Sequence, residues 1–218
     1  MTSLSYRGGL MPKQTFFNLD KEKQERIKYA AIDEFSTKVY EQVNLSDIIK
    51  KARIPRGSFY QYFDDKKDLY LYILDIIKET KLMYIGDLYQ QSDLPLLDLV
   101  LELYKKGLIF AERHPKLVQI FEHLVHHKND IYDEIISTAK EQTTSYFLTI
   151  IQRDQKTGRL RDDIDAKMLA SMITNLTTNV TLDDFSSNSE HNIQEMENSI
   201  YLLVDILRRG IQKNGKDL

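Results

Sequence analysis

The amino-acid sequence predicts an all-α protein of about nine helices. Glycine and proline, which interrupt regular helices, number only 8 and 4 among 218 residues. Apolar residues recur at helical spacing along nearly the whole chain, and no segment shows the sustained alternation typical of a half-buried strand. These two observations together favour a protein built only from helices.

Periodicity and helix-start signals place the individual helices. Asn18 or Asp20 is expected to cap the first helix, and Pro115 to open the sixth. The segment KTGRLRDD at 156–163 is expected to form a turn, and SSNSE at 186–190 a polar loop that caps the final helix. The approximate helical ranges are 19–37, 45–52, 56–63, 66–91, 93–113, 115–127, 129–156, 165–183 and 190–213.

Residues 44–63, NLSDIIKKARIPRGSFYQYF, predict two short helices joined by a tight turn. Asn44 can cap the first helix, whose apolar residues then fall on one face. Pro55 fixes its φ at the start of the second helix, where no backbone donor is needed. Phe59 and Phe63 lie four residues apart, so both should pack against the first helix.

The remaining side chains of the second helix, Arg56, Ser58, Tyr60 and Gln61, should face outward. Arginine binds guanine edges or phosphates, glutamine pairs with adenine, and hydroxyl groups bind phosphate oxygens. Gly57 leaves room for another backbone to approach closely. The pattern predicts a DNA-binding helix-turn-helix, although an ordinary solvated helix pair has the same spacing.

The segment from Ile27 to about Leu74 resembles the N-terminal domain of the tetracycline-repressor (TetR) family of bacterial transcriptional regulators. The resemblance rests on AAIDEF, NLSDIIKKA and IPRGSFYQYFDDKKDLY, and the aromatic-rich SFYQYF before DDKKDL is its most specific part. Val39 and Arg53 stand where the family commonly has glycine, and Pro55 replaces a frequent Ser or Thr cap. The segment MPKQTFFNLDKEKQERI resembles the start of family members with a slightly long N-terminus, and either Met1 or Met11 is the start.

The resemblance implies a DNA-binding domain over 1–65 and an effector-binding and dimerisation domain over 66–218. It further implies a ligand-responsive regulator, taken as a repressor, that a small apolar or amphipathic effector releases from a pseudo-palindromic operator when the fourth helix shifts. Asn44, Ser46 and Lys66 would anchor phosphates, and Tyr62 would lie at the flank of the recognition helix. The full set of expected DNA contacts is Asn44, Ser46, Arg56, Gly57, Ser58, Tyr60, Gln61, Tyr62 and Lys66.

The last two predicted helices each carry a broad apolar stripe. In the TetR family these helices form a four-helix bundle with those of a second subunit, so the resemblance implies a homodimer. Periodicity alone equally allows the stripes to close the subunit's own core, but the two-fold symmetry of an operator favours dimerisation. The expected interface residues are Leu169, Leu176, Val180, Met196, Ile200, Leu203 and Leu207.

Aromatic and methionine residues in the middle helices are candidates to line an effector cavity, although such residues more commonly fill a core. One candidate, Asn175, lies in the segment TNLTTNVT at 174–181, which suits either a polar part of a pocket or a solvated face. The expected effector-binding residues are Tyr84, Tyr104, Phe110, Phe121, Tyr146, Met172 and Asn175.

Composition excludes several classes of function. The chain has no cysteine, so it has neither disulfides nor a thiolate nucleophile. It shows no catalytic motif and no Gly-rich phosphate loop, so we expect neither an enzyme nor a cofactor. His123, His126 and His127 have the spacing of a metal pair, but they lack a third ligand of known position, so we expect no metal.

The distribution of charge fits a protein that meets nucleic acid with one end only. Residues 1–70 hold 13 Lys or Arg and 10 Asp or Glu, whereas the whole chain has a net charge of −3.

No apolar run reaches the 18 or so residues that cross a bilayer, so we expect a cytoplasmic protein without a membrane partner. The alternative is a helical-bundle ligand-binding or scaffold protein whose helix-turn-helix contacts protein rather than DNA.

Overall fold

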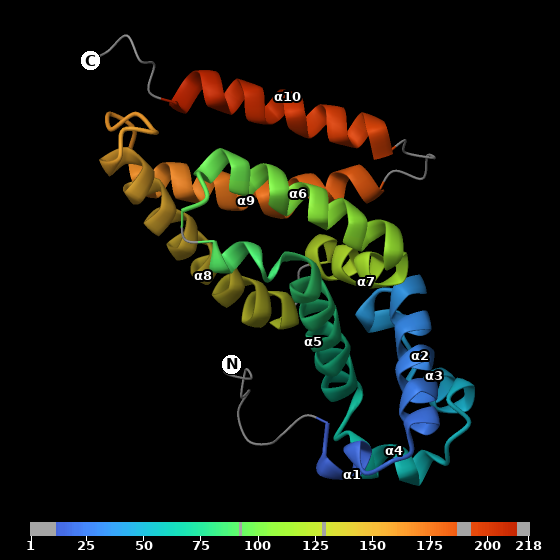
Figure 1. Cartoon of the computed structure of the whole chain (residues 1–218). Helices are drawn as coiled ribbons and strands as arrows, with labels where there is room; N and C mark the ends of the chain where they lie inside the picture. Colours follow the sequence, from blue (N-terminus) through green and yellow to red (C-terminus); the bar gives the residue numbers. More distant parts are fainter. Residues whose placement is uncertain (1–11, 92, 128–129, 187–192, 213–218) are drawn as a thin grey trace. The chain divides into compact units, whose positions relative to one another are not determined.

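The computed structural model describes residues 12–91, 93–127, 130–186 and 193–212, and over these ranges it confirms the all-α prediction. The predicted helices are present with shifted ends, and a short helix α1 precedes them (Figure 1). Within the described residues the only extended pairing is one bridge between Leu160 and Gln212. The α-helices are α1 (Gln14–Phe17), α2 (Lys21–Thr37), α3 (Leu45–Lys51), α4 (Arg56–Tyr62), α5 (Lys66–Ile85), α6 (Leu96–Arg113), α7 (Pro115–His126), α8 (Asp130–Lys156), α9 (Ala166–Ser186) and α10 (Ile193–Ile211); two short 3-10 helices are η1 (Tyr40–Gln42) and η2 (Leu88–Gln90).

The chain divides into two compact units. Unit 1 comprises Met1–Thr80 and Pro115–His127, and unit 2 comprises Lys81–His114 and Lys128–Leu218. Helix α5 therefore contributes its first part to unit 1 and its last turns to unit 2. The compact N-terminal unit thus extends past residue 65 and includes α7, which is distant in the sequence.

Unit 1 is built around α2. Asp20 precedes the helix, and its side chain accepts a hydrogen bond from the Lys23 amide at 2.8 Å, which identifies Asp20 rather than Asn18 as the cap. Its buried face includes Ile27 and Phe35, and α3 and α7 both pack against the helix. Helices α3 and α4 also pack on each other, and both bury apolar side chains, Ile48 and Ile49 on α3 and Phe59 on α4.

Helix α7 is fixed to α2 by polar contacts as well as packing. Asp33 of α2 forms ion pairs with Lys116 of α7 and Lys51 of α3. The Nδ1 atom of His123 lies 3.2 Å from the Phe35 carbonyl oxygen near the end of α2. One aspartate therefore joins three helices of unit 1.

Unit 2 is a helical bundle in which α6 contacts each of α8, α9 and α10 (Figure 1). Asp154, near the end of α8, is buried and accepts hydrogen bonds from the Leu96 amide at 2.8 Å and from the Arg153 Nε at 2.9 Å. A buried carboxylate at the start of α6 is favourable because it pairs with an otherwise free amide and with the helix dipole.

Helix α5 ends earlier than the sequence predicts, at Ile85 rather than near residue 91. The following residue is Gly86, whose amide donates to the Leu82 carbonyl oxygen at 2.8 Å. A Cβ atom at this position would lie 2.6 Å from that same oxygen, so the close approach requires glycine. In the part of the chain that the structure describes, no helix has the length and apolarity needed to span a membrane.

Candidate nucleic-acid interface

Helix α3 begins as the sequence predicts. The Asn44 side-chain oxygen accepts a hydrogen bond from the Ser46 amide at 2.9 Å, which confirms Asn44 as the N-cap. Ile48 and Ile49 are buried, whereas Asn44 and Ser46 are exposed. The polar start of α3 is therefore available to a partner while its apolar face holds the core.

The turn between α3 and α4 is a Schellman motif centred on Arg53. The Arg53 amide donates to the Lys50 carbonyl at 3.1 Å, and the Ile54 amide donates to the Ile49 carbonyl at 3.3 Å. Arg53 has a φ of 53°, the left-handed conformation that usually requires glycine. The turn is therefore complete with arginine at the left-handed position, where the resemblance leads us to expect glycine.

Helix α4 exposes polar side chains, as the sequence predicts for a recognition helix. Arg56 and Gln61 are exposed, Tyr60 is 43% exposed and Ser58 is half-buried. Arg56 also reaches back to α3, where its Nη1 donates to the Ser46 Oγ at 3.2 Å. This bond brings two of the expected DNA contacts, one from each helix, into a single surface.

Gly57 lies in the first turn of α4 and faces open space. A Cβ atom added there would have no neighbouring atom within 4 Å. The fold itself therefore has no steric need for glycine at this position. Glycine therefore leaves the surface at the start of α4 open.

Two of the expected DNA contacts have their functional groups turned into unit 1. Tyr62 is buried, and its ring packs against Phe16 with a centroid distance of 6.3 Å. The Lys66 Nζ donates to the carbonyl oxygens of Tyr40 at 2.7 Å and Val43 at 2.9 Å. We therefore assign both residues to the support of the helix-turn-helix and leave them out of the proposed contact surface.

The acidic-basic segment DDKKDL caps the start of α5. Asp65 accepts a hydrogen bond from the Asp68 amide at 2.8 Å, and Asp68 accepts one from the Asp64 amide at 2.9 Å. Burial raises the pKa of Asp68 above its ordinary value, and the Asp64 amide opposes this shift. The segment therefore fixes the join between α4 and α5.

Sequence reasoning missed a contribution from α1 and the residue before it. The Lys13 amide and ammonium donate to carbonyl oxygens at the end of α4, those of Tyr62 and Tyr60, both at 3.0 Å. The Thr15 hydroxyl donates to the Gln61 carbonyl oxygen. A four-residue helix is too short to give a periodic signal, so the sequence pattern alone does not reveal it.

The expected effector-binding residues do not form one group. Phe121 belongs to unit 1, whereas Tyr84, Tyr104, Phe110, Tyr146, Met172 and Asn175 belong to unit 2. Tyr104 and Phe110 are buried, and Met172 is 50% exposed. In the adjacent polar run, Thr174 is buried and accepts a hydrogen bond from the Thr144 hydroxyl at 3.1 Å, so this threonine joins α8 to α9.

Tyr84 and Phe110 are brought together with His114, which sequence reasoning did not select. The Tyr84 Oη lies 3.0 Å from the His114 Nε2, and the two rings both contact Phe110. Tyr146 instead packs edge-on against Tyr89 at 5.0 Å. Burial raises the pKa of Tyr89 and of Tyr146.

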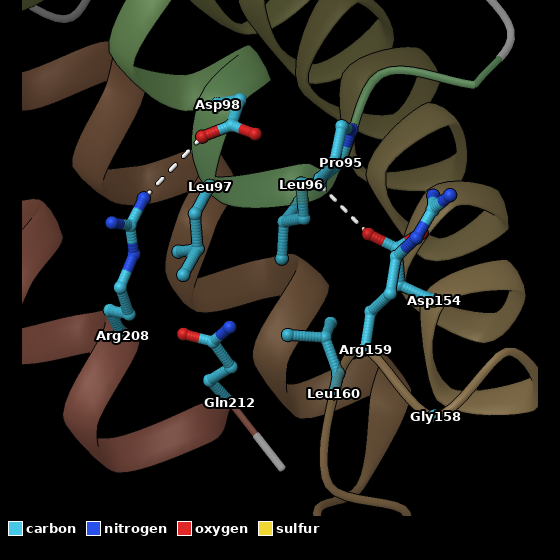
Figure 2. Close-up of a pocket in the computed structure, with 10 residues that line it drawn as sticks. All are labelled: Pro95, Leu96, Leu97, Asp98, Asp154, Gly158, Arg159, Leu160, Arg208 and Gln212. Carbon is cyan, nitrogen blue, oxygen red and sulfur yellow. Dashed lines mark hydrogen bonds and ion pairs between the residues drawn. The ribbon is translucent and has the colours of Figure 1, made fainter. Parts of the chain in front are cut away.

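A pocket of about 290 Å³ lies in unit 2, near the start of α6 and the α8–α9 turn (Figure 2). Its two arginines both face carboxylates: Arg208 Nη2 lies 3.4 Å from Asp98 Oδ1, and Arg159 Nη1 lies 3.4 Å from Asp154 Oδ1. It is lined by Pro95, Leu96, Leu97, Asp98, Asp154, Gly158, Arg159, Leu160, Arg208 and Gln212, a set that includes none of the expected effector-binding residues.

The apolar stripes of α9 and α10 belong largely to the subunit core, the alternative that periodicity left open. Leu169 and Ile200 are buried in this core, and Leu176, Leu203 and Leu207 are partly buried against it. The side chains of Val180 and Met196 lie outside the described part of the structure. Other apolar residues are exposed instead: Met168 at 55%, Met172 at 50%, Leu202 at 62% and Ile206 at 58%.

Comparison with known proteins agrees with this architecture. Residues 27–73 match the model of the family described as bacterial regulatory proteins, tetR family. The chain is 28% identical over 177 residues to the uncharacterized HTH-type transcriptional regulator YvdT of Bacillus subtilis (strain 168), covering 78% of this chain and 83% of YvdT.

Solved structures extend the likeness over nearly the whole chain. A TetR family transcriptional regulator from Chloroflexus aurantiacus J-10-FL is 29% identical, with a TM-score of 0.74 over 94% of this chain and 100% of that protein. The transcriptional regulator FadR from Bacillus subtilis, solved in complex with stearoyl-CoA, shares the fold at 16% identity, with a TM-score of 0.66 over 83% of this chain and 96% of FadR.

The family is one of transcriptional regulators and not a class of enzymes. The N-terminal helix-turn-helix, the helical second unit and the likeness to these regulators all lead to the same assignment. Residues 27–73 form a TetR-family DNA-binding domain, and the chain resembles TetR family transcriptional regulators over nearly its whole length.

Proposed function

We propose that this regulator represses transcription by binding a pseudo-palindromic operator through the polar face of α3 and α4. The proposed contact surface consists of Asn44, Ser46, Arg56, Gly57, Ser58, Tyr60 and Gln61. The observation that carries the proposal is the combination of exposed Arg56, Tyr60 and Gln61 with the empty space around Gly57. These groups suit phosphate oxygens and base edges, and glycine permits close approach of a duplex backbone.

Within this surface we propose different roles for different residues. Asn44 and Ser46 lie at the start of α3, where amides and short polar side chains favour a phosphate. Arg56, held by Ser46, would contact a base edge or a phosphate from the start of α4. Tyr60 and Gln61 lie in the last turn of α4 and would extend the contact along the groove.

We propose that the functional form is a homodimer joined through the exposed apolar faces of α9 and α10. Met168 and Met172 lie one helical turn apart on α9, and Leu202 and Ile206 do so on α10. Large exposed apolar groups of this kind are typical of an interface. A second copy is the occupant that suits a two-fold operator, because each subunit would then present one α4 to one half-site.

We propose that a small apolar or amphipathic effector binds unit 2 and releases the operator from this cytoplasmic regulator. The aromatic pairs Tyr84–Phe110 and Tyr89–Tyr146 offer apolar rings with hydroxyl groups. FadR, which shares the fold, was solved with stearoyl-CoA, an amphipathic molecule. Such an effector acts only through its different affinities for the DNA-bound and released conformations.

Substitution of Arg56 tests the DNA contact directly. We expect Arg56→Ala to weaken binding to the upstream region of the chain's own gene by about 1–3 kcal/mol if Arg56 contacts a base, and to relax preference at one position. Fluorescence anisotropy on that duplex, measured against a scrambled duplex at several salt concentrations, gives both quantities.

Gly57→Ala is the matched variant within the same helical turn. It creates no internal clash, so we expect unfolding in urea to show unchanged or slightly increased stability while operator affinity falls. If both variants bind the duplex like the parent, the contact surface is wrong. Binding of a protein partner with no salt-dependent binding of DNA would instead support the alternative, a scaffold whose helix-turn-helix contacts protein.

A further inference from the structure

We propose that Lys13 and Thr15 are positioning residues for DNA recognition, because they cap the C-terminal end of α4 and thereby hold Tyr60 and Gln61 in position. The inference rests on the proposed role of α4 in binding DNA. It assigns a function to residues 13–17, which precede the helix-turn-helix and contribute no side chain to the proposed contact surface.

Helix α4 needs support from outside itself. It spans only Arg56–Tyr62, and Pro55 at its start provides no side-chain cap. The last carbonyl groups of any α-helix have no partner within the helix, and a helix of two turns is marginal in water. The orientation of α4 therefore depends on groups supplied by other segments.

Residues 13–15 supply a donor to each of three successive carbonyls at the end of α4. The Lys13 ammonium donates to the Tyr60 oxygen at 3.0 Å, and the Lys13 amide donates to the Tyr62 oxygen at 3.0 Å. The Thr15 hydroxyl donates to the Gln61 oxygen between them. Together these bonds act as a C-cap that comes from a segment more than forty residues away in the sequence.

The charge of Lys13 is directed toward α4 and the residue beyond it. Its ammonium forms an ion pair with Asp64 as well as the bond to the Tyr60 oxygen. A positive charge at the C-terminal end of a helix interacts favourably with the helix dipole. Lys13 is therefore placed to stabilise α4 rather than to extend toward a phosphate.

Aromatic packing holds the donors in place. Phe16 of α1 is fully buried, and its ring centroid lies 5.2 Å from that of Phe63 and 5.3 Å from that of Tyr72. Phe16 thereby anchors α1 where α4 ends and α5 begins. Binding groups hold a productive geometry only when the residues that carry them are themselves fixed, and Tyr60 and Gln61 are fixed through their own carbonyls.

The experiment compares Thr15→Val with Thr15→Ser in the full chain. Valine keeps the approximate shape of threonine and removes the hydroxyl donor, whereas serine retains it. The exposed Gln14, whose side chain bonds Asn18 within its own turn, provides the control variant Gln14→Ala. The probe is a duplex that the parent chain selects from a random-sequence pool, measured beside a scrambled duplex of the same length.

We expect Thr15→Val to weaken binding to the selected duplex about three- to tenfold, which corresponds to one lost hydrogen bond. Affinity for the scrambled duplex and the salt dependence should stay at the parent values, because no charge is removed. Thr15→Ser should restore the selected-duplex affinity, and Gln14→Ala should match the parent. Parent-like binding by Thr15→Val, or equal loss on both duplexes, would overturn the proposal.

Lys13→Met provides a second test that keeps the Lys13 amide and the apolar stem. It should also lower the ratio of selected to scrambled affinity without changing the salt slope, whereas a slope reduced by about 1 would show a phosphate contact and overturn the positioning role. Hydrogen exchange of the protein without DNA tests the cap of α4 separately from the proposed binding of DNA. Faster exchange of the last α4 amides in Thr15→Val supports the cap even if the parent selects no duplex, and unchanged exchange contradicts it.

Discussion

At the scale of single residues, Arg53 shows how a family position changes while its geometry is kept. The residue adopts a φ of 53°, and both hydrogen bonds of the Schellman motif are present around it. A side chain in this conformation brings Cβ close to the following carbonyl oxygen, at a cost of roughly 1–2 kcal/mol. The tight turn between α3 and α4 is kept because the buried side chains of Ile49 and Ile54, on either side of it, hold the backbone in place.

We expect Arg53→Gly to raise the free energy of unfolding by roughly 0.5–1 kcal/mol. Glycine removes the left-handed strain, and its greater freedom in the unfolded chain offsets part of the gain. Urea unfolding followed by circular dichroism measures the change, and Arg53→Ala controls for loss of the guanidinium. A glycine variant that is no more stable than the alanine variant would show that the turn stores no strain.

Lys66 and Tyr62 show why sequence spacing alone did not fix the contact surface. Both follow the family pattern for the end of the helix-turn-helix, and either side chain has groups that bind phosphate. The structure commits the Lys66 ammonium to two carbonyl oxygens and places its Nζ 4.4 Å from the centre of the Tyr40 ring. These partners lie more than twenty residues away, so their position depends on tertiary packing.

At the scale of elements, α2 connects the helix-turn-helix to α7. Asp33 pairs with Lys51 and Lys116, and the neighbouring Glu34 pairs with Lys38 and Lys51. Hydrogen bonds from Lys116 and Lys51 lower the pKa of Asp33 below its ordinary value of 3.8. The lowered pKa indicates that the folded state favours the ionised carboxylate.

This ion-pair group predicts a specific pH dependence. A carboxylate with a lowered folded pKa adds stability above its unfolded pKa, and that contribution is lost as the pH falls through the folded pKa. We therefore expect the parent to lose stability below about pH 4 more steeply than Asp33→Asn. Urea unfolding across this range provides the comparison.

Two neighbouring lysines of α3 provide a second test of the ion pair and its control. Lys51→Met removes one partner of Asp33, so the loss of stability below about pH 4 should become less steep. Lys50→Met changes the neighbouring exposed lysine and should leave the dependence of stability on pH unchanged. Identical profiles for the parent and Asp33→Asn would show that the ion pairs contribute nothing to folding, as many exposed pairs do not.

At the scale of the whole molecule, the surfaces of α9 and α10 determine the proposed assembly. The leucines predicted in the interface, Leu169, Leu176, Leu203 and Leu207, pack in or against the core of unit 2. The exposed Met168, Leu202 and Ile206 were not predicted in the interface, and the exposed Met172 was predicted as an effector contact. On α10 the exposed residues each precede a predicted interface residue by one position. A shift of one residue turns a side chain by about 100° around a helix, which separates core from surface.

We expect Leu202→Glu to convert the proposed dimer to a monomer while the helical fold is retained. Two charges would be buried without partners across a two-fold interface, which costs several kcal/mol. Sedimentation velocity measures the oligomeric state, and circular dichroism measures the fold. Gln142→Glu places the same charge on an exposed site of α8 and should leave the oligomeric state unchanged.

The neighbouring Leu203→Glu distinguishes the proposed interface from the core. Leu203 packs against the buried cluster of unit 2, so a charge there should destabilise the fold itself. A Leu202→Glu variant that keeps the parent's oligomeric state would remove α10 from the proposed interface.

The amino-acid sequence alone predicts the helical fold, the cap at Asn44 and the likeness to the TetR family, because these depend on periodicity and on bonds between residues a few positions apart. It leaves the first cap open between Asn18 and Asp20, and the structure selects Asp20. The tertiary structure alone decided that α1 caps α4, that the Lys66 ammonium is bound inside unit 1, and that α7 packs against α2. It also decided which apolar face of α10 is exposed. The physical reason is that each of these features joins groups distant in sequence, and spacing along one helix does not specify which face meets another segment.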